Sequence, residues 1–148
     1  MSVPHEMTIP RRLAGRYLKI ELLGISGSFD FVFDKLTFKT QTSVTNEAPA
    51  LASTTDPLVR DIYKVGLNTL KECMQTVYED GPKRDRRLWI GDLYLEALAN
   101  AHTFKNHELT KHCLYLLAAF ANDEGLLHAT LLEKPQPHPQ YGTHTLDY

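Results

Sequence analysis

Asp80-Gly81-Pro82-Lys83-Arg84-Asp85-Arg86-Arg87-Leu88-Trp89-Ile90-Gly91-Asp92 is the most informative stretch of this 148-residue chain. It combines three carboxylates, four cations and the only tryptophan. Gly81-Pro82 indicates a turn, and the proline-free run that follows it predicts a helix. If the first turn of that helix includes Asp85, the side chains of Asp85, Trp89 and Asp92 share one helical face.

Such a face would suit a sugar. An indole can stack on a pyranose ring, and carboxylates can accept hydrogen bonds from hydroxyls or transfer protons. A helix N-terminus and the flanking Arg84 and Arg86 would favour the charged form of Asp85, so an acid role requires burial and the charges of Asp80 and Asp92 to outweigh them. Two alternatives are a capped helix start with solvated charges and a basic peptide for nucleic-acid binding or nuclear import, and the interleaved aspartates argue against the second.

The same stretch resembles the signature of bacterial α-L-rhamnosidases, glycoside hydrolase family 78, of the six-hairpin glycosidase class. That signature reads Asp-Gly-x-x-Arg-Glu-Arg-x-x-Trp-x-Gly-Asp, and residues 80–92 match it at every fixed position except one. The exception is Asp85, which stands where the family has glutamate. Aspartate is one methylene shorter, so this position implies a closer backbone, a different substrate or lost activity.

The resemblance implies a role for each matched residue. Asp85 takes the position of the general acid that protonates the glycosidic oxygen. Asp80 and Asp92 take those of sugar-binding carboxylates, Trp89 that of an aromatic wall, and Arg84 that of a residue orienting a carboxylate or hydroxyl. The family inverts configuration, which requires a second carboxylate about 6.5–9.5 Å from the acid to activate water. No segment of this chain matches the context of that base, so the resemblance implies the general-acid half of a site.

Composition and charge also bear on the partners, the location and the metal or cofactor binding of the protein. A net charge of −2 gives no overall attraction to nucleic acid, and no apolar run is long enough to span a bilayer. The polar, proline-bearing N-terminus lacks signal-peptide character, so we expect a cytoplasmic protein. Cys73 and Cys113 lie in apolar helical patterns and are expected to be buried free thiols. The seven histidines lack the spacing of a zinc helix, so neither a metal nor a cofactor is expected.

Residues 1–45 predict β-strands. Leu18, Ile20 and Leu22 alternate with polar residues, and the phenylalanines of 29–33 alternate after a glycine-rich turn. Two or three strands cannot form a sheet core alone. We therefore interpret this segment as the end of a β-sandwich domain, to which it bears a weak resemblance in the rhamnosidase family.

Residues 46–56 predict a linker within a stretch rich in Ser, Thr, Ala and Pro, and residues 57–148 the first part of an (α/α)6 catalytic domain. Asp56-Pro57 predicts the start of a helix running to about Tyr78 with an apolar stripe through Leu58, Ile62 and Val65. A second helix is expected to about Phe104 and a third over 107–121, packed as antiparallel neighbours. A short strand or turn is expected at 126–132, loop at 134–141, and the start of another helix at 145–148.

The overall prediction is an α+β fragment of a glycosidase that hydrolyses terminal α-L-rhamnosides with inversion of configuration. The alternatives are a noncatalytic helical binding or assembly module and a six-hairpin hydrolase for another sugar. A partial toroid leaves apolar helix faces uncovered, so self-association of the fragment is expected.

Overall fold

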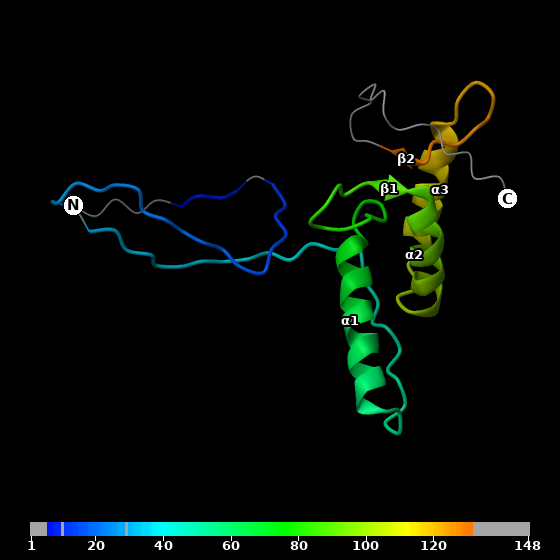
Figure 1. The fold of residues 1–148 in the computed structure, drawn as a ribbon, viewed down its shortest axis with the longest axis horizontal. Helices are drawn as coiled ribbons and strands as arrows, with labels where there is room; N and C mark the ends of the chain where they lie inside the picture. Colours follow the sequence, from blue (N-terminus) through cyan, green and yellow to red (C-terminus); the bar gives the residue numbers. More distant parts are fainter. Residues whose placement is uncertain (1–5, 10, 29, 132–148) are drawn as a thin grey trace. The chain divides into compact units, whose positions relative to one another are not determined.

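The computed structural model describes residues 6–9, 11–28 and 30–131. The chain divides into two compact units, Met1–Lys39 and Thr40–Tyr148. The elements of the second unit, in chain order, are α1 (Pro57–Cys73), β1 (Leu88–Trp89), α2 (Ile90–His102), α3 (His107–Ala119) and β2 (Thr130–Leu131) (Figure 1). This is the predicted α+β fragment. Among the described residues, the helices are too short or too polar to cross a bilayer.

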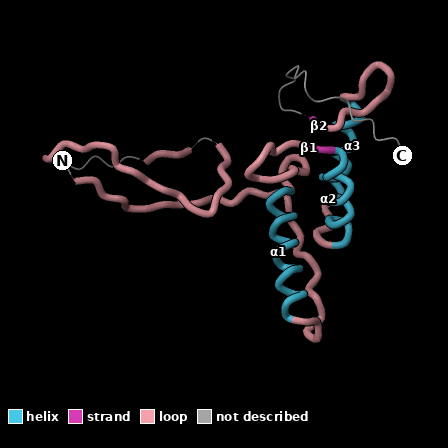
Figure 2. The backbone as a smooth tube through the Cα atoms, viewed as in Figure 1, coloured by secondary structure: helices cyan, strands magenta, loops and turns pink. Residues whose placement is uncertain are grey.

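The described part of the first unit is extended chain without an assigned strand, drawn as loop in Figure 2. The predicted alternation is visible where Phe31 and Phe33, two positions apart, pack edge to face with ring centroids 4.9 Å apart. Leu18, Ile20 and Leu22 are 47, 49 and 53% exposed, so the apolar face predicted for this strand is uncovered. Without a second layer to bury that face, the strands predicted at 17–22 and 29–33 do not form ladders in the described residues.

Helix α1 begins where the sequence predicts. The Asp56 carboxylate accepts a hydrogen bond from the Leu58 N–H at 2.8 Å, and Pro57 fills the first turn, where its missing N–H is not needed. The predicted apolar stripe divides in two. Leu70 and Cys73 are buried, whereas Leu58 and other members of its N-terminal half are exposed, with Leu58, Ile62 and Val65 at 67, 63 and 64%.

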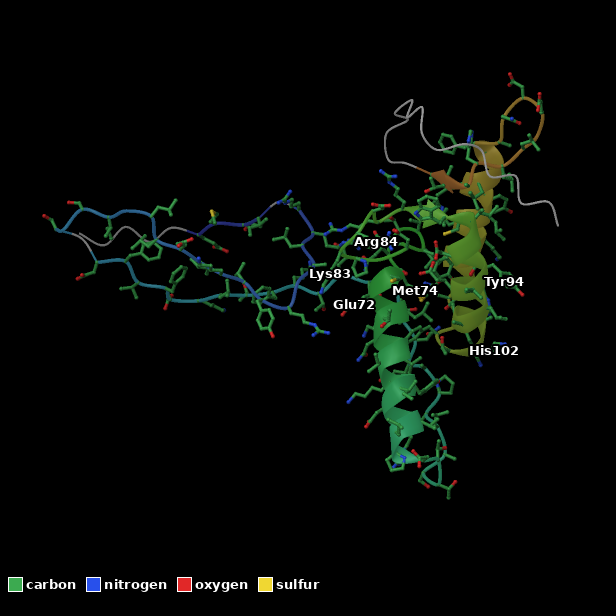
Figure 3. The ribbon with its side chains drawn as sticks, viewed as in Figure 1. Glu72, Met74, Lys83, Arg84, Tyr94 and His102 are labelled. Atoms are coloured by element: carbon green, nitrogen blue, oxygen red, sulfur yellow. The ribbon has the colours of Figure 1, made fainter. Side chains whose placement is uncertain are left out.

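The predicted extension of α1 to Tyr78 is wrong. The helix ends at Cys73 because Met74 adopts an extended conformation and pairs with Tyr78 in a β-bridge. Both side chains are fully buried (0% exposed), which fixes this tight turn in the core. Figure 3 shows Met74 at the end of α1 and Tyr94 on the side of α2 away from α1.

Residues 42–48, of which 46–48 fall in the expected linker, belong to the second unit and pack against its core, and we call them the docked segment. The Ser43 N–H donates to the Met74 carbonyl at 2.9 Å. Val44 and Ala48 pack against the core, and the Asn46 amide donates to the Phe104 carbonyl at 3.0 Å. The polar residues of this segment therefore form hydrogen bonds with the backbone at helix ends, and the segment is not a linker without contacts.

Helix α2 starts later than predicted. Its first residue is Ile90, and Trp89 is the residue before the helix, in extended conformation. Leu88 and Trp89 form β1, which pairs antiparallel with β2 in the register Leu88↔Leu131 and Trp89↔Thr130. The Thr130 hydroxyl donates to the Leu88 carbonyl at 3.0 Å, so this short ladder fastens the entry to α2. Within the strand or turn predicted at 126–132, the described residues form a strand only at Thr130–Leu131.

A buried asparagine joins α2 to α3. Asn100 is 0% exposed, accepts the Asn106 N–H at 3.0 Å through Oδ1 and donates through Nδ2 to the Asn106 carbonyl at 2.9 Å. Asn106 in turn caps α3 by accepting the Leu109 N–H at 3.2 Å. On these helices Leu93, Leu109, Cys113 and Leu117 are buried, whereas Tyr94, Leu98 and Phe120 are exposed.

The core lies where α1, the turn after it, α2 and α3 meet. Its buried members are Leu70, Met74, Tyr78, Leu88, Leu93, Phe104, Leu109, Cys113 and Leu117. The two thiols are free and buried, as predicted. The predictions for 134–141 and 145–148 lie outside the described residues.

Candidate functional site

The segment between α1 and α2 is a loop closed by Asp80 and Arg87, and we call residues 80–87 the acid loop. The Asp80 N–H donates to the Arg87 carbonyl at 3.1 Å, and the Arg87 N–H donates to the Asp80 carboxylate at 3.0 Å. Inside it, Gly81 and Arg84 form a turn, and the Arg86 side chain donates through Nε to the Pro82 carbonyl at 2.7 Å. Arg86 adopts a positive φ of 54°, which reverses the chain toward β1.

The prediction that Asp85, Trp89 and Asp92 share one helical face is wrong. Asp85 lies in the acid loop, Trp89 in β1 and only Asp92 in a helix. Long-range bonds explain the difference: the loop is closed at both ends, and β1 is held by β2, so no helix can start before Ile90. Asp85 and Arg84 are exposed on this loop, which Figure 3 marks at Arg84 and its neighbour Lys83.

Trp89 and Asp92 flank the start of α2. Trp89 is half-buried, so part of its indole is accessible, and its backbone is fixed by pairing with Thr130. Asp92 is exposed in the first turn of α2, where the helix dipole favours a negative charge. The predicted aromatic wall and one predicted sugar-binding carboxylate are therefore close in sequence and on adjoining elements.

Asp80 and Asp92 belong to a group of carboxyls that also includes Glu79 and Glu96. Burial, followed by the charges of Asp92, Asp80 and Glu79, raises the pKa of the Glu96 carboxyl to about 8. Glu79 is itself buried, at 6% exposed. Asp80 and Asp92 thus both act on Glu96, while Asp85 and Arg84 lie on the exposed part of the acid loop.

Sequence reasoning missed Glu79 and Glu96. Glu96 follows Asp92 by four residues, a spacing that places both side chains on one side of a helix. A helix predicted over these residues therefore also predicts that Glu96 lies near Asp92. The inward position of Glu79 was not readable, because it depends on the turn that ends α1. The Glu79 N–H donates to the Cys73 carbonyl at 2.9 Å, which fixes the backbone of that turn.

An open cavity of about 330 Å³ lies between α1 and α2, lined in part by Leu70, Cys73, Leu95, Glu96 and Ala99. Burial is the main cause that raises the pKa of the Cys73 thiol to about 11, with further contributions from Glu96 and other acidic side chains. A thiol with so high a pKa is a poor nucleophile at neutral pH. Among the described residues, no group of three His, Cys, Asp or Glu side chains is placed to hold a metal ion.

Carboxylates, a partly accessible indole and a cation-bearing loop can hold sugar hydroxyls and deliver a proton. Cys73 and Cys113 are poorly suited to act as nucleophiles, because burial raises the pKa values of both thiols. The exposed and half-buried polar groups of residues 80–92 are compatible with binding a carbohydrate.

Comparisons with known proteins agree with this chemistry. Residues 1–40 match the glycosyl hydrolase family 78 alpha-rhamnosidase N-terminal domain, and residues 48–145 match the bacterial alpha-L-rhamnosidase 6 hairpin glycosidase domain. A rhamnosidase from Klebsiella oxytoca, solved with rhamnose bound, is 50% identical in sequence with a TM-score of 0.59. The similarity covers 64% of this chain and 18% of that one, so the chain spans under a fifth of that enzyme. No curated protein matches the chain.

Proposed function

Because the chain belongs to the bacterial α-L-rhamnosidase family of six-hairpin glycosidases, we propose that it supplies the general-acid half of a site that hydrolyses terminal α-L-rhamnosides with inversion. The main support for this proposal is the acid loop, whose ends are joined by hydrogen bonds between Asp80 and Arg87. Asp85 is exposed on this loop, shortly before the Trp89–Asp92 segment. A proton donor must be held in a fixed position beside the glycosidic oxygen. A loop whose two ends are hydrogen-bonded to each other restricts the movement of the donor and so supports that task.

In this proposal Asp85 protonates the leaving oxygen, and Asp92 and Asp80 accept hydrogen bonds from the sugar. One oxygen of Asp80 already accepts the Arg87 N–H, which leaves its second oxygen for a hydroxyl. Trp89 provides an apolar surface for the ring, and Arg84 orients a carboxylate or hydroxyl. The base that activates water belongs to the remainder of the six-hairpin domain.

A chimera tests the acid. The Klebsiella oxytoca rhamnosidase is 50% identical over the matched region, so its corresponding segment can be replaced by residues 48–131 of this chain. We expect the chimera to hydrolyse an aryl α-L-rhamnoside, with Asp85→Asn lowering kcat by about 100-fold or more and Asp85→Glu retaining or raising it. Asp123→Asn, an exposed aspartate beyond α3, is the matched control. Full activity of Asp85→Asn in a folded chimera would exclude Asp85 as the acid.

The sugar-binding part can be tested on the chain itself. Trp89 is the only tryptophan, so its fluorescence reports directly on the proposed sugar surface. We expect L-rhamnose to change this fluorescence saturably and D-glucose to have a smaller effect, with Asp92→Asn weakening rhamnose binding at least about tenfold through the loss of a charged acceptor. A response that persists unchanged in Asp92→Asn would remove that residue from the sugar site.

We also propose the domain division 1–45, 46–56 and 57–148, and self-association of the isolated chain. The support for self-association is the exposed apolar row Leu58, Ile62 and Val65 on α1, which has no covering element among the described residues. Light scattering after size exclusion should give a mass above that of one chain, and Ile62→Glu should restore a monomer. A wild-type monomer at all accessible concentrations would contradict this.

A further inference from the structure

Glu96 stands apart from the carboxyls already assigned a role. It lines the cavity between α1 and α2, and its Oε2 is buried without a hydrogen-bond partner. The other lining residues are apolar except for the Cys73 thiol and the Thr69 hydroxyl, so the lining offers no cation to neutralise a carboxylate. An ionised carboxylate oxygen in such a place is costly, whereas a protonated carboxyl is tolerated.

The groups facing Glu96 from the neighbouring elements reinforce this. Asp92 lies one turn earlier on α2, and Glu79 and Asp80 approach from the turn and loop after α1. Cys73 on α1 and Cys113 on α3 are thiols whose pKa values are raised by burial and by the Glu96 charge, and Tyr78 is affected in the same direction. The side chains whose charges act on Glu96 are thus all acidic, and they favour its neutral form.

We propose that Glu96 is a positioning residue for the sugar-binding carboxylates: it holds a proton at neutral pH, and this neutral form keeps the first turn of α2, with Asp92, in its sugar-binding place. If Glu96 ionises, its Oε2 must turn toward water or open the α1–α2 contact. Asp92 lies one turn earlier on the same helix and must respond. This inference rests on the proposed function, because it takes Asp92 and Asp80 as sugar ligands.

The sugar-independent test is a side-chain carboxyl NMR titration of the full 148-residue chain, with Glu96→Gln identifying the Glu96 signal. We expect Glu96 to titrate near pH 8 and the Asp92 signals to shift in that same step. Glu96→Gln, the isosteric mimic of the neutral form, should abolish this Asp92 shift. Titration of Glu96 near its ordinary value, or an Asp92 signal that ignores the Glu96 step, would overturn the proposal.

The functional test is L-rhamnose binding between pH 6 and 9.5, followed by Trp89 fluorescence. Wild-type affinity should fall about tenfold between pH 7 and pH 9, as expected if sugar selects the protonated form, while Glu96→Gln stays level. Glu108→Gln, exposed on α3, should follow the wild type. A wild-type affinity that does not fall across this range would overturn the positioning role alone. Absence of rhamnose binding at every pH would instead refute the sugar site, with the NMR titration still deciding the Glu96–Asp92 coupling.

Discussion

Replacing Asn100 by aspartate should separate hydrogen-bond geometry from charge at the α2–α3 junction. Asn100→Asp preserves shape and the Oδ1 that accepts the Asn106 N–H, but it removes the Nδ2 donor to the Asn106 carbonyl at 2.9 Å. Losing that bond costs about 1 kcal/mol, and burying a carboxylate against a carbonyl at a 0% exposed position adds about 2 kcal/mol. We expect the free energy of unfolding at pH 7 to fall by about 3 kcal/mol.

The pH dependence of this loss supplies the stronger test. Burial raises the pKa of the introduced carboxyl in the folded state above its unfolded value. The native variant therefore binds a proton that the unfolded variant releases, and the variant's stability relative to wild type falls as pH rises through that interval. Near pH 4 the protonated carboxyl can donate to the Asn106 carbonyl, so the deficit should shrink to about 1 kcal/mol.

Urea unfolding followed by far-UV circular dichroism at pH 4 and pH 7 measures both values. Asn122→Asp is the matched control, because Asn122 is exposed and its Oδ1 accepts the N–H groups of Glu124 and Leu126 at 3.0 and 2.8 Å, which a carboxylate can also do. It should change stability by less than about 0.5 kcal/mol. An Asn100→Asp variant as stable as wild type at pH 7, or with a deficit independent of pH, would refute the account of this junction.

Three further outcomes follow from burial, capping and ionisation. Leu117→Ala, at a 2% exposed core position, should lower the free energy of unfolding by about 3 kcal/mol in urea, and Leu114→Ala on the same helix, at 54% exposed, by well under half of that; equal losses would contradict the assigned core. Asp56→Ala should cost about 1 kcal/mol in the same assay while Asp56→Asn costs little, because asparagine keeps the capping oxygen; indistinguishable variants would mean that the cap contributes nothing. The raised pKa of Glu96 means that the folded chain retains a proton which the unfolded chain loses between pH 4.5 and about 8, so stability should fall over that range and level off above it. Partial exposure screens the effect to about 2 kcal/mol, and a Glu96→Gln profile with the same slope as wild type would assign the loss to other groups.

The features that the sequence predicted well are local ones. The start of α1 depends on two adjacent residues, Asp56 and Pro57, whose capping chemistry needs no partner elsewhere. The span of α3 is similarly set by a cap at Asn106 and an apolar period. The identity of the site segment came from resemblance, because its fixed residues keep their spacing whatever conformation the loop adopts.

The features that the sequence could not predict depend on distant partners. The end of α1 is decided by Met74, whose carbonyl is bonded to the docked segment about thirty residues earlier in the chain. The late start of α2 depends on Asp80 closing the acid loop and on β2 pairing with β1. Asn100 is polar within a helix and looks like a surface residue, yet it is buried because it bonds the backbone of the next turn.

The docked segment also imposes an order on the folding of this protein during its synthesis. Ser43 is bonded to Met74, and its carbonyl accepts the Asn106 amide, which is 63 residues later in the chain. At typical translation rates the ribosome needs roughly 3–13 s to make those residues. Until then the segment has no partner at the α2–α3 turn, so a nascent chain halted before Asn106 cannot complete this part of the fold. Some of the earliest residues of the unit therefore complete their contacts only after the α2–α3 turn has been made.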